Sequence, residues 1–311
     1  MSEEIIKHFK VDPIDSGKRL DLYLVEKLPK FSRTQIQGAI REKKVTIDGV
    51  PRKSHTFLHP GQSIKIHIPV PKIIRLLPEN IPLEVLYEDE NILVINKQPG
   101  LVVHPAPGHL EHTLVNAILH HCQTLAKTDN PLRPGIVHRL DKDTSGCLLI
   151  AKQEGGLRKL GAQFEKRKVM KQYLALVWGV LKGVKGELLL GISRHPTDRK
   201  KMAVTLTGKQ AHTTFEVVEK FKRATLIRVV LKTGRTHQIR VHMAHLGHPV
   251  LGDSDYGKKG LEVAKELGIT RQMLHAAFLE IIHPENNQPI SFSAPIPQDM
   301  NEAILKLRAE I

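Results

Sequence analysis

The chain has 311 residues, of which 41% are hydrophobic and 25% are charged, proportions that are ordinary for a globular protein. Its 47 Lys and Arg outnumber its 32 Asp and Glu, which leaves a formal charge of +15. Such a charge favours a polyanionic partner, RNA or DNA first of all, although a merely basic enzyme would show the same balance.

Cys122 and Cys147 are the only cysteines, and they lack CxxC spacing. A disulfide framework and a cysteine-ligated zinc site are therefore excluded, and a reducing cytoplasm is expected. The first ten residues carry acidic side chains and no apolar stretch, and no apolar run reaches the ~18 residues of a membrane span. We expect a soluble, cytoplasmic protein without a membrane partner.

The first quarter of the chain is its most basic part. Residues 1–75 carry 15 Lys and Arg against 8 Asp and Glu. Leu20, Leu24 and Leu28 recur at the spacing of one helical face, and Ser32 with Gln35 is a capping-box pair that predicts the start of a second helix. Alternating apolar residues then predict strands over 45–47 and 64–68, on either side of turns.

This segment resembles the S4 domain, a small RNA-binding module, over roughly residues 17–68. We place the domain at 1–70 and interpret Arg33, Arg41, Lys43 and Lys44, on the second helix and the turn after it, as RNA-binding residues. A solvated cationic face without a partner is the alternative. Residues 69–82 contain four prolines, which predicts a linker, and residues 83–311 form the second predicted domain.

The second domain begins with strand patterns. Residues 83–97 predict a hairpin around an acidic turn, and Thr113–His120 predicts a short helix. Short strands at 136–137 and 147–151 enclose a polar loop that contains Asp141 and Asp143 among cations. Cations favour the charged form of a carboxylate, and an ionised Asp serves as a nucleophile or a base. Composition does not distinguish the two aspartates, nor a catalytic loop from a salt-bridged turn.

The loop sequence HRLDKDTSG, residues 138–146, resembles the signature of the RluA-type pseudouridine synthases. The resemblance implies that Asp141 is the catalytic residue, and that Arg139 contacts RNA and fills the space left by a displaced uridine. Two further segments, KVMKQYLALVWG and LKTGRTHQIRVHMAHLGHPVLGD, resemble the same family. They imply an active-site tyrosine at Tyr173 and an active-site basic residue at Arg235.

Other residues of these segments receive roles at the edge of the site. The resemblance to RluA-type enzymes leads us to expect that Arg235 pairs with Asp141 or with phosphate. The segment that contains Arg235 predicts a strand, a glycine turn and then a helix from about Thr236. Arg240, one helical turn beyond Arg235, is expected to bind phosphate or to pack, and Leu231 and Ile239 are expected to contact the uracil ring. The resemblance covers residues 83–311 and is nearest to the D type of the large-subunit ribosomal RNA pseudouridine synthases.

The resemblance implies an α+β fold, in which an S4 domain precedes a catalytic domain with a largely antiparallel or mixed sheet flanked by helices. The implied function is isomerisation of specific uridines to pseudouridine in 23S rRNA or the pre-ribosomal large subunit, by a monomer. The reaction oxidises nothing, so no cofactor is expected, and the sequence contains no P-loop, GxGxxG or HExxH motif. The histidines His237, His242, His245 and His248 lack completing ligands, so no metal is expected.

Three alternatives remain open at this stage. The enzyme could act on tRNA or on other 23S rRNA sites. The chain could be a non-catalytic ribosome-assembly factor, which would tolerate a degenerate loop. It could also be a hydrolase that uses Asp141 with Asp143, but two residues apart on extended chain such side chains point to opposite faces.

Overall fold

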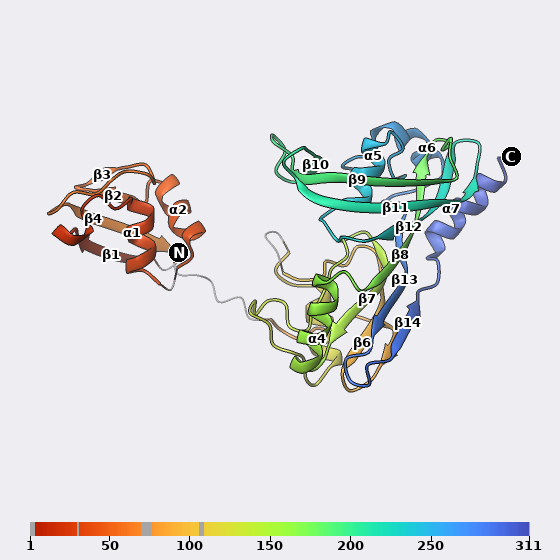
Figure 1. Cartoon of the computed structure of the whole chain (residues 1–311), viewed down its shortest axis with the longest axis horizontal. Coiled ribbons are helices and arrows are strands. Elements are labelled where there is room, and N and C mark those ends of the chain that lie inside the picture. The colour runs from red at the N-terminus through yellow and green to blue at the C-terminus, as the bar shows by residue number, and fades with distance from the viewer. Residues whose placement is uncertain (1–3, 30, 70–75, 106–108, 311) are drawn as a thin grey trace. The chain divides into compact units, whose positions relative to one another are not determined.

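The computed structural model describes residues 4–29, 31–69, 76–105 and 109–310, and the chain divides into two units, Met1–Ile74 and Arg75–Ile311 (Figure 1). The elements of the first unit are β1 (Glu4–Lys10), a 3₁₀ turn (Pro13–Asp15), α1 (Leu20–Lys27), α2 (Arg33–Arg41), β2 (Val45–Ile47), β3 (Val50–Pro51) and β4 (Ser63–Pro69). Its antiparallel strands form one sheet in the order β1-β4-β2-β3.

The capping box predicted for the first unit is present, and a tight turn joins two of its strands. Ser32 Oγ accepts a hydrogen bond from Gln35 N, and Gln35 Oε1 accepts one from Ser32 N, so the capping box at α2 is confirmed. Asp48 and Gly49 both have positive φ, 51° and 80°, which is the geometry of a tight hairpin turn between β2 and β3. Apolar side chains of α1, α2 and the sheet form one buried core.

The strand β1 is absent from the sequence-based prediction. It pairs with β4 over its whole length, from Glu4 opposite Pro69 to Lys10 opposite Ser63. Ile5 and Ile6 are adjacent, and the side chain of Ile6 is exposed, so the segment shows no clean alternation that would mark a half-buried strand. Pro69, predicted to begin the linker, is the last residue of β4, and Pro71 lies outside the described residues.

The second unit is built on a mixed sheet (Figure 1). Its strands are β5 (Glu84–Glu88), β6 (Ile92–Lys97), β7 (Ser145–Ala151), β8 (Met170–Trp178), β9 (Lys185–Arg194), β10 (Met202–Val204), β11 (Lys209–Lys220), β12 (Ala224–Leu231), β13 (Leu274–Ile282) and β14 (Pro289–Ser293). The order is β10-β9-β11-β12-β8-β13-β7-β6-β5, and β14 pairs with β13. Only β7 and β13 are paired in parallel within the described ranges, so the predicted largely antiparallel, mixed sheet is confirmed.

Helices cover this sheet. They are α3 (Leu114–His121), α4 (Glu154–Glu165), α5 (Gln238–His245), α6 (Leu261–Glu266) and α7 (Gln298–Arg308), with a 3₁₀ turn at Lys258–Gly260. The hairpin β5–β6, the helix after Thr113 and the strand β8 were all predicted correctly. The predicted strand at Ile136 and Val137 is wrong, because Ile136 forms only an isolated bridge with Ile150 and Gly135 before it adopts a positive φ.

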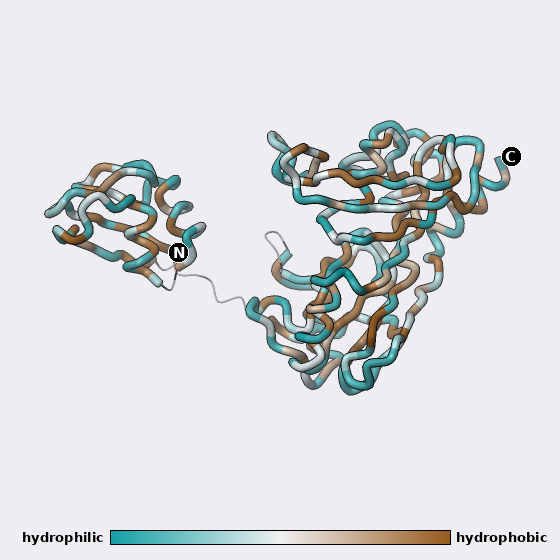
Figure 2. The backbone as a smooth tube through the Cα atoms, in the orientation of Figure 1, coloured by the Kyte–Doolittle hydropathy of each residue, from teal (hydrophilic) through white to brown (hydrophobic). Residues whose placement is uncertain are grey.

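The strand β7 is the best-buried support in the second unit, since all seven of its side chains are buried. Leu148 and Ile150 belong to the core under α3, whereas Cys147, Leu149 and Ala151 belong to the core under α4. Alternate residues therefore face opposite sides of the sheet, and both sides are covered. Figure 2 shows apolar chain running along β6 and β7, with polar residues in the turns. A loop anchored on such a strand is held rigidly.

Gly146, at the start of β7, is required by close packing. Its φ is +111°, and a β-carbon there would lie 2.3 Å from the carbonyl oxygen of Ala276 on β13. Both the backbone conformation and the contact exclude any other residue. The end of the polar loop is thereby fixed against β13.

We predict that Gly146→Ala lowers the free energy of unfolding by at least about 2 kcal/mol, because the β7–β13 pairing must separate. Gly161→Ala in α4 is the matched control, since nothing lies within 4 Å of its β-carbon and alanine favours a helix by up to ~1 kcal/mol. Denaturant unfolding of both variants checks this. A Gly146→Ala protein as stable as the control would contradict the packing argument.

Candidate active site

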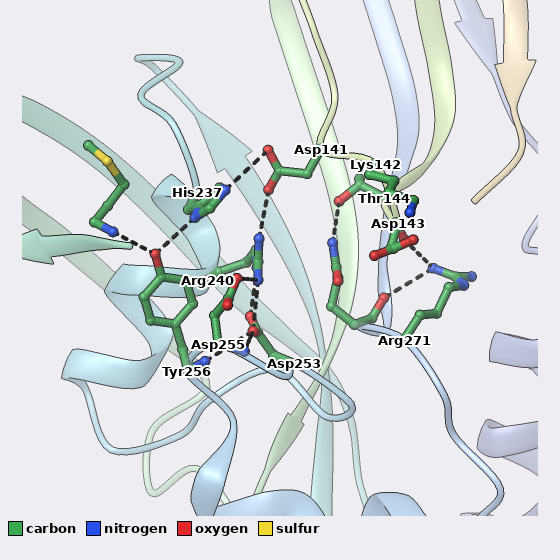
Figure 3. A network of polar contacts seen from close by, with 12 residues as sticks. Asp141, Lys142, Asp143, Thr144, His237, Arg240, Asp253, Asp255, Tyr256 and Arg271 are labelled. Atoms are coloured by element: carbon green, nitrogen blue, oxygen red, sulfur yellow. Dashed lines mark hydrogen bonds and ion pairs between the residues drawn. The ribbon is translucent and has the colours of Figure 1, made fainter. Parts of the chain in front are cut away.

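Asp141 lies in a tight turn immediately before β7, and its side chain is 18% exposed. The amide of Thr144 donates to the carbonyl oxygen of Asp141 at 3.1 Å, which closes the turn. The predicted extended conformation of this segment is therefore wrong. Asp143 is held through its backbone, because Arg271 Nη1 donates to its carbonyl oxygen at 3.0 Å (Figure 3). No carboxylate dyad of Asp141 and Asp143 is seen, and no described residue bonds the Asp143 side chain.

Lys97 holds the same turn from beneath. Its side chain is 1% exposed, and Nζ donates to the carbonyl oxygens of Gln98, Leu101 and Lys142 at 2.7, 3.1 and 2.8 Å. Three acceptors match the three N–H groups of an ammonium. Burial lowers the pKa of Lys97 to about 7, against the opposing charge of nearby Asp143. The residue after Asp141 is thus tied to the end of β6.

The cation that pairs with Asp141 is Arg240, on α5 (Figure 3). Arg240 Nη1 lies 3.2 Å from Asp141 Oδ2, and the guanidinium is only 5% exposed. Arg235 was predicted to pair with Asp141 or with phosphate. The pairing with Asp141 is wrong, because Arg235 Nε donates to the carbonyl oxygen of Gln210 at 3.2 Å, and the phosphate contact stays a prediction. Helix α5 begins at Gln238, two residues later than predicted, after His237 in a left-handed conformation with φ 54°.

Two further carboxylates, Asp253 and Asp255, hold the guanidinium of Arg240 (Figure 3). Nε and Nη2 donate to the two oxygens of the buried Asp253 at 2.7 and 2.8 Å, and Nη2 also donates to Asp255 at 2.8 Å. Such a bidentate pair fixes the plane of the guanidinium. Burial alone lowers the pKa of Arg240, but Asp253 and Asp141 outweigh it and raise the pKa above its usual value. Arg240 thus stays charged.

His237 lies on the other side of Asp141, with Nε2 3.9 Å from Asp141 Oδ1, beyond hydrogen-bond distance. The amide of Met202 donates to the hydroxyl oxygen of Tyr256, which lies 2.8 Å from His237 Nδ1. Burial lowers the pKa of His237, which keeps the ring neutral, although Asp141 opposes the shift.

These groups border a cavity of about 100 Å³. Seven predicted site residues line it, namely Arg139, Asp141, Tyr173, Leu231, Arg235, Ile239 and Arg240. Tyr173 comes from β8, Leu231 ends β12, and Ile239 is on α5, so three separate elements meet there. Burial, and then the charge of Asp141, raise the pKa of Tyr173, which keeps its phenol protonated at neutral pH. The cavity combines an apolar, aromatic wall with one carboxylate.

The predicted RNA-binding residues of the first unit lie on α2 and the turn after it. Arg41 and Lys43 are exposed. Arg33 Nη2 bonds the buried Asp21 at 3.2 Å, so this residue also has a structural role. Lys44 forms an ion pair with Glu42 at 3.3 Å.

The residues that hold the site together were not predicted from the sequence, namely Lys97, Asp253, Asp255 and Tyr256. Two signals were available. The apolar run ILVINK ends in Lys97, and a buried lysine must find hydrogen-bond partners. The acidic segment GDSDYG, which contains Asp253, Asp255 and Tyr256, lies just after the residues of α5. Neither pattern indicates which residues the lysine or the aspartates contact.

Among the described residues, no group of three His, Cys, Asp or Glu is placed to hold a metal ion. No helix in this part of the chain combines the length and apolar character needed to cross a membrane.

Comparisons with known proteins give the family of the chain. A sequence profile of the S4 domain matches residues 18–64, and one of RNA pseudouridylate synthase matches residues 91–245. The ribosomal large subunit pseudouridine synthase D of Pseudomonas aeruginosa is 40% identical over 318 aligned positions, which cover 100% of this chain and 98% of that protein. The chain belongs to the RNA pseudouridine synthase family.

Other members of the RNA pseudouridine synthase family are similar over most of the chain. An uncharacterised RNA pseudouridine synthase of Bacillus subtilis is 41% identical, with 94% of this chain and 95% of that protein covered. The structure of human RNA pseudouridylate synthase domain containing 1 matches with a TM-score of 0.57 and 25% identity, over 74% of this chain and 96% of its own. As a family member, the chain is an isomerase that acts on RNA, with an S4 RNA-binding domain at its N-terminus.

We predict that Lys97→Met destabilises the protein by about 2 kcal/mol or more, because three carbonyl groups around a buried position lose their donor. The exposed Lys182→Met serves as the control and should change stability by no more than about 0.5 kcal/mol. Chemical denaturation measures both. Equal stability of the two variants would show that Lys97 does not hold the turn.

Proposed function

We propose that this pseudouridine synthase modifies specific uridines of 23S rRNA, in the large ribosomal subunit or its precursor, with Asp141 as the essential catalytic carboxylate. The observation that carries the proposal is the Asp141–Arg240 ion pair at the wall of a cavity that also contains Tyr173. The names of relatives such as the ribosomal large subunit pseudouridine synthase D of Pseudomonas aeruginosa support the large ribosomal subunit as the substrate. Action in the cytoplasm, as a monomer, stays a prediction.

The reaction sets the demands on the cavity. The N1–C1′ bond of uridine breaks, the uracil turns, C5 bonds to C1′, the C5 proton leaves to solvent, and N1 gains a proton, so the product is an isomer. Asp141 either adds to C1′ or removes the C2′ proton to give a glycal, and both routes need an ionised, oriented carboxylate. Arg240, itself fixed by Asp253, supplies that orientation. Neither route changes an oxidation state, so no redox cofactor is required.

The remaining residues of the cavity fit the uracil ring and the RNA strand. Tyr173 offers a ring for stacking, and its protonated phenol favours this role over that of a base. Leu231 and Ile239 provide apolar contact. Since a base inside a stem cannot reach Asp141, we infer that the uridine is flipped out and that Arg139 fills its place.

Arg235 and the first unit complete the proposed RNA contacts. Arg235, which does not touch Asp141 and lines the cavity, is assigned to the phosphate backbone. Arg33, Arg41, Lys43 and Lys44 of the S4 domain are assigned to further contacts with the RNA.

Tritium release from 23S rRNA labelled at C5 of uridine tests the proposal. We expect release by the wild type and none detectable with Asp141→Asn, with RNA affinity and melting temperature close to wild type. Asp143→Asn is the matched control, because the structure gives its carboxylate no bonded partner, and it should release tritium at a rate within about threefold of wild type.

The other outcomes identify the alternatives. Release from tRNA alone would overturn the 23S rRNA assignment while leaving the reaction intact. No release from rRNA, tRNA or partly assembled subunits would favour an assembly factor. Full activity of Asp141→Asn would refute the role of Asp141.

A further inference from the structure

A second cavity, of about 520 Å³, adjoins the first. The two share five lining residues, namely Arg139, Tyr173, Leu231, Gly234 and Arg235. The outer wall of the second cavity comes from the end of α4 and the start of β8, with Arg167 and Lys171, and from Lys232 after β12. Because the two cavities adjoin, a ligand in the first cavity can place an attached group in the second.

The lining of this second cavity is strongly cationic. Arg139, Arg167, Lys171, Lys232 and Arg235 face a single carboxylate, that of Glu165. Within the described ranges no acidic side chain pairs with Arg167, Lys171 or Lys232, whereas Arg223 and Arg308 elsewhere in the unit are each paired with glutamates. Like charges that gather without counter-charges repel one another, so the cavity favours an anion.

Lys171 is the most constrained of these cations. It is half-buried on β8, two residues before Tyr173, so both side chains project from the same face of the strand. Its Nζ lies 5.7 Å from the centre of the Phe164 ring. It also lies 3.9 Å from the position that a β-carbon would take if Gly234 were replaced by a larger residue. Burial lowers the pKa of Lys171, because no nearby counter-charge offsets the hydration that its charged form loses in the free protein.

The aromatic floor under Lys171 is rigid and uncharged. Phe164 stacks on His138, with ring centroids 4.8 Å apart and planes 19° apart. His138 Nε2 accepts a hydrogen bond from Leu149 N at 2.9 Å, and burial lowers the pKa of His138 to about 3, so its ring stays neutral. Phe164 is thereby fixed beside β7, and the ammonium of Lys171 is held over a defined surface.

We propose that this second cavity binds a phosphodiester of the RNA strand next to the flipped uridine, with Lys171 and Arg167 as its ligands. The inference rests on the proposed function, in which the first cavity holds the uracil. A flipped nucleotide brings its flanking phosphates to the mouth of the pocket that takes its base. A phosphodiester supplies the counter-charge that Lys171 lacks, and it carries no sequence information, so the contact positions the strand.

The salt dependence of RNA binding by the full-length protein tests the site. The probe is a 23S rRNA transcript, and the dissociation constant is measured over a series of KCl concentrations. Loss of one phosphate contact should reduce the slope of log Kd against log salt by about 0.7, and weaken binding about three- to tenfold at ~0.1 M salt, in Lys171→Met. Lys171→Arg should restore the slope, and Lys182→Met, which removes an exposed lysine outside the cavity, should keep the wild-type slope.

Arg167→Met gives a second, independent measure, because Arg167 is exposed and its loss spares the core. A reduced slope in this variant supports the site even where Lys171→Met does not fold. Wild-type slopes in both variants overturn the site. Weaker binding with an unchanged slope also overturns it and indicates a base contact with Phe164.

Tritium release by the wild type, measured on the same RNA, separates the two proposals. Release together with unchanged slopes refutes the phosphate site and leaves the proposed function standing. Absence of release refutes the proposed function, while the slopes still report on the phosphate contact.

Discussion

The ion pair between Asp141 and Arg240 is the constraint on which the site depends. The two side chains come from distant parts of the chain, a turn before β7 and a helix after β12, and they meet at 3.2 Å. In the proposed reaction, the carboxylate needs a fixed position and a cationic neighbour that keeps its charge. Arg240 meets both needs because Asp253 and Asp255 fix its guanidinium plane and raise its pKa.

Each partner of this pair rests on a separate support. Lys97 and Arg271 hold the backbone of the Asp141 turn, and Gly146 allows β7 to approach β13 closely behind it. On the other side, buried Gln238 ties the start of α5 to β11, since its Nε2 donates to Thr213 Oγ1 at 2.9 Å. The mixed sheet carries both supports, so its rigidity sets the distance between Asp141 and Arg240.

The sequence predicted features whose cause is local. The capping box at Ser32, the helix after Thr113 and the strand β8 follow from short-range patterns, and the unbroken loop motif led to Asp141. The choice between Arg235 and Arg240 is not local. The left-handed backbone at His237 delays α5 by two residues, and the aspartates that hold Arg240 come from a later loop. The strand β1 was missed for a related reason, since only its pairing with β4 defines it.

The most direct test of the Asp141–Arg240 claim compares Arg240→Lys with Arg235→Lys in single-turnover tritium release from 23S rRNA. Both variants keep their charge, but a lysine at 240 cannot reproduce the planar set of contacts to three carboxylates. We expect Arg240→Lys to slow the reaction about 100-fold or more, and Arg235→Lys to slow it less than about tenfold. The reverse order, with Arg240→Lys near the wild-type rate, would contradict the account.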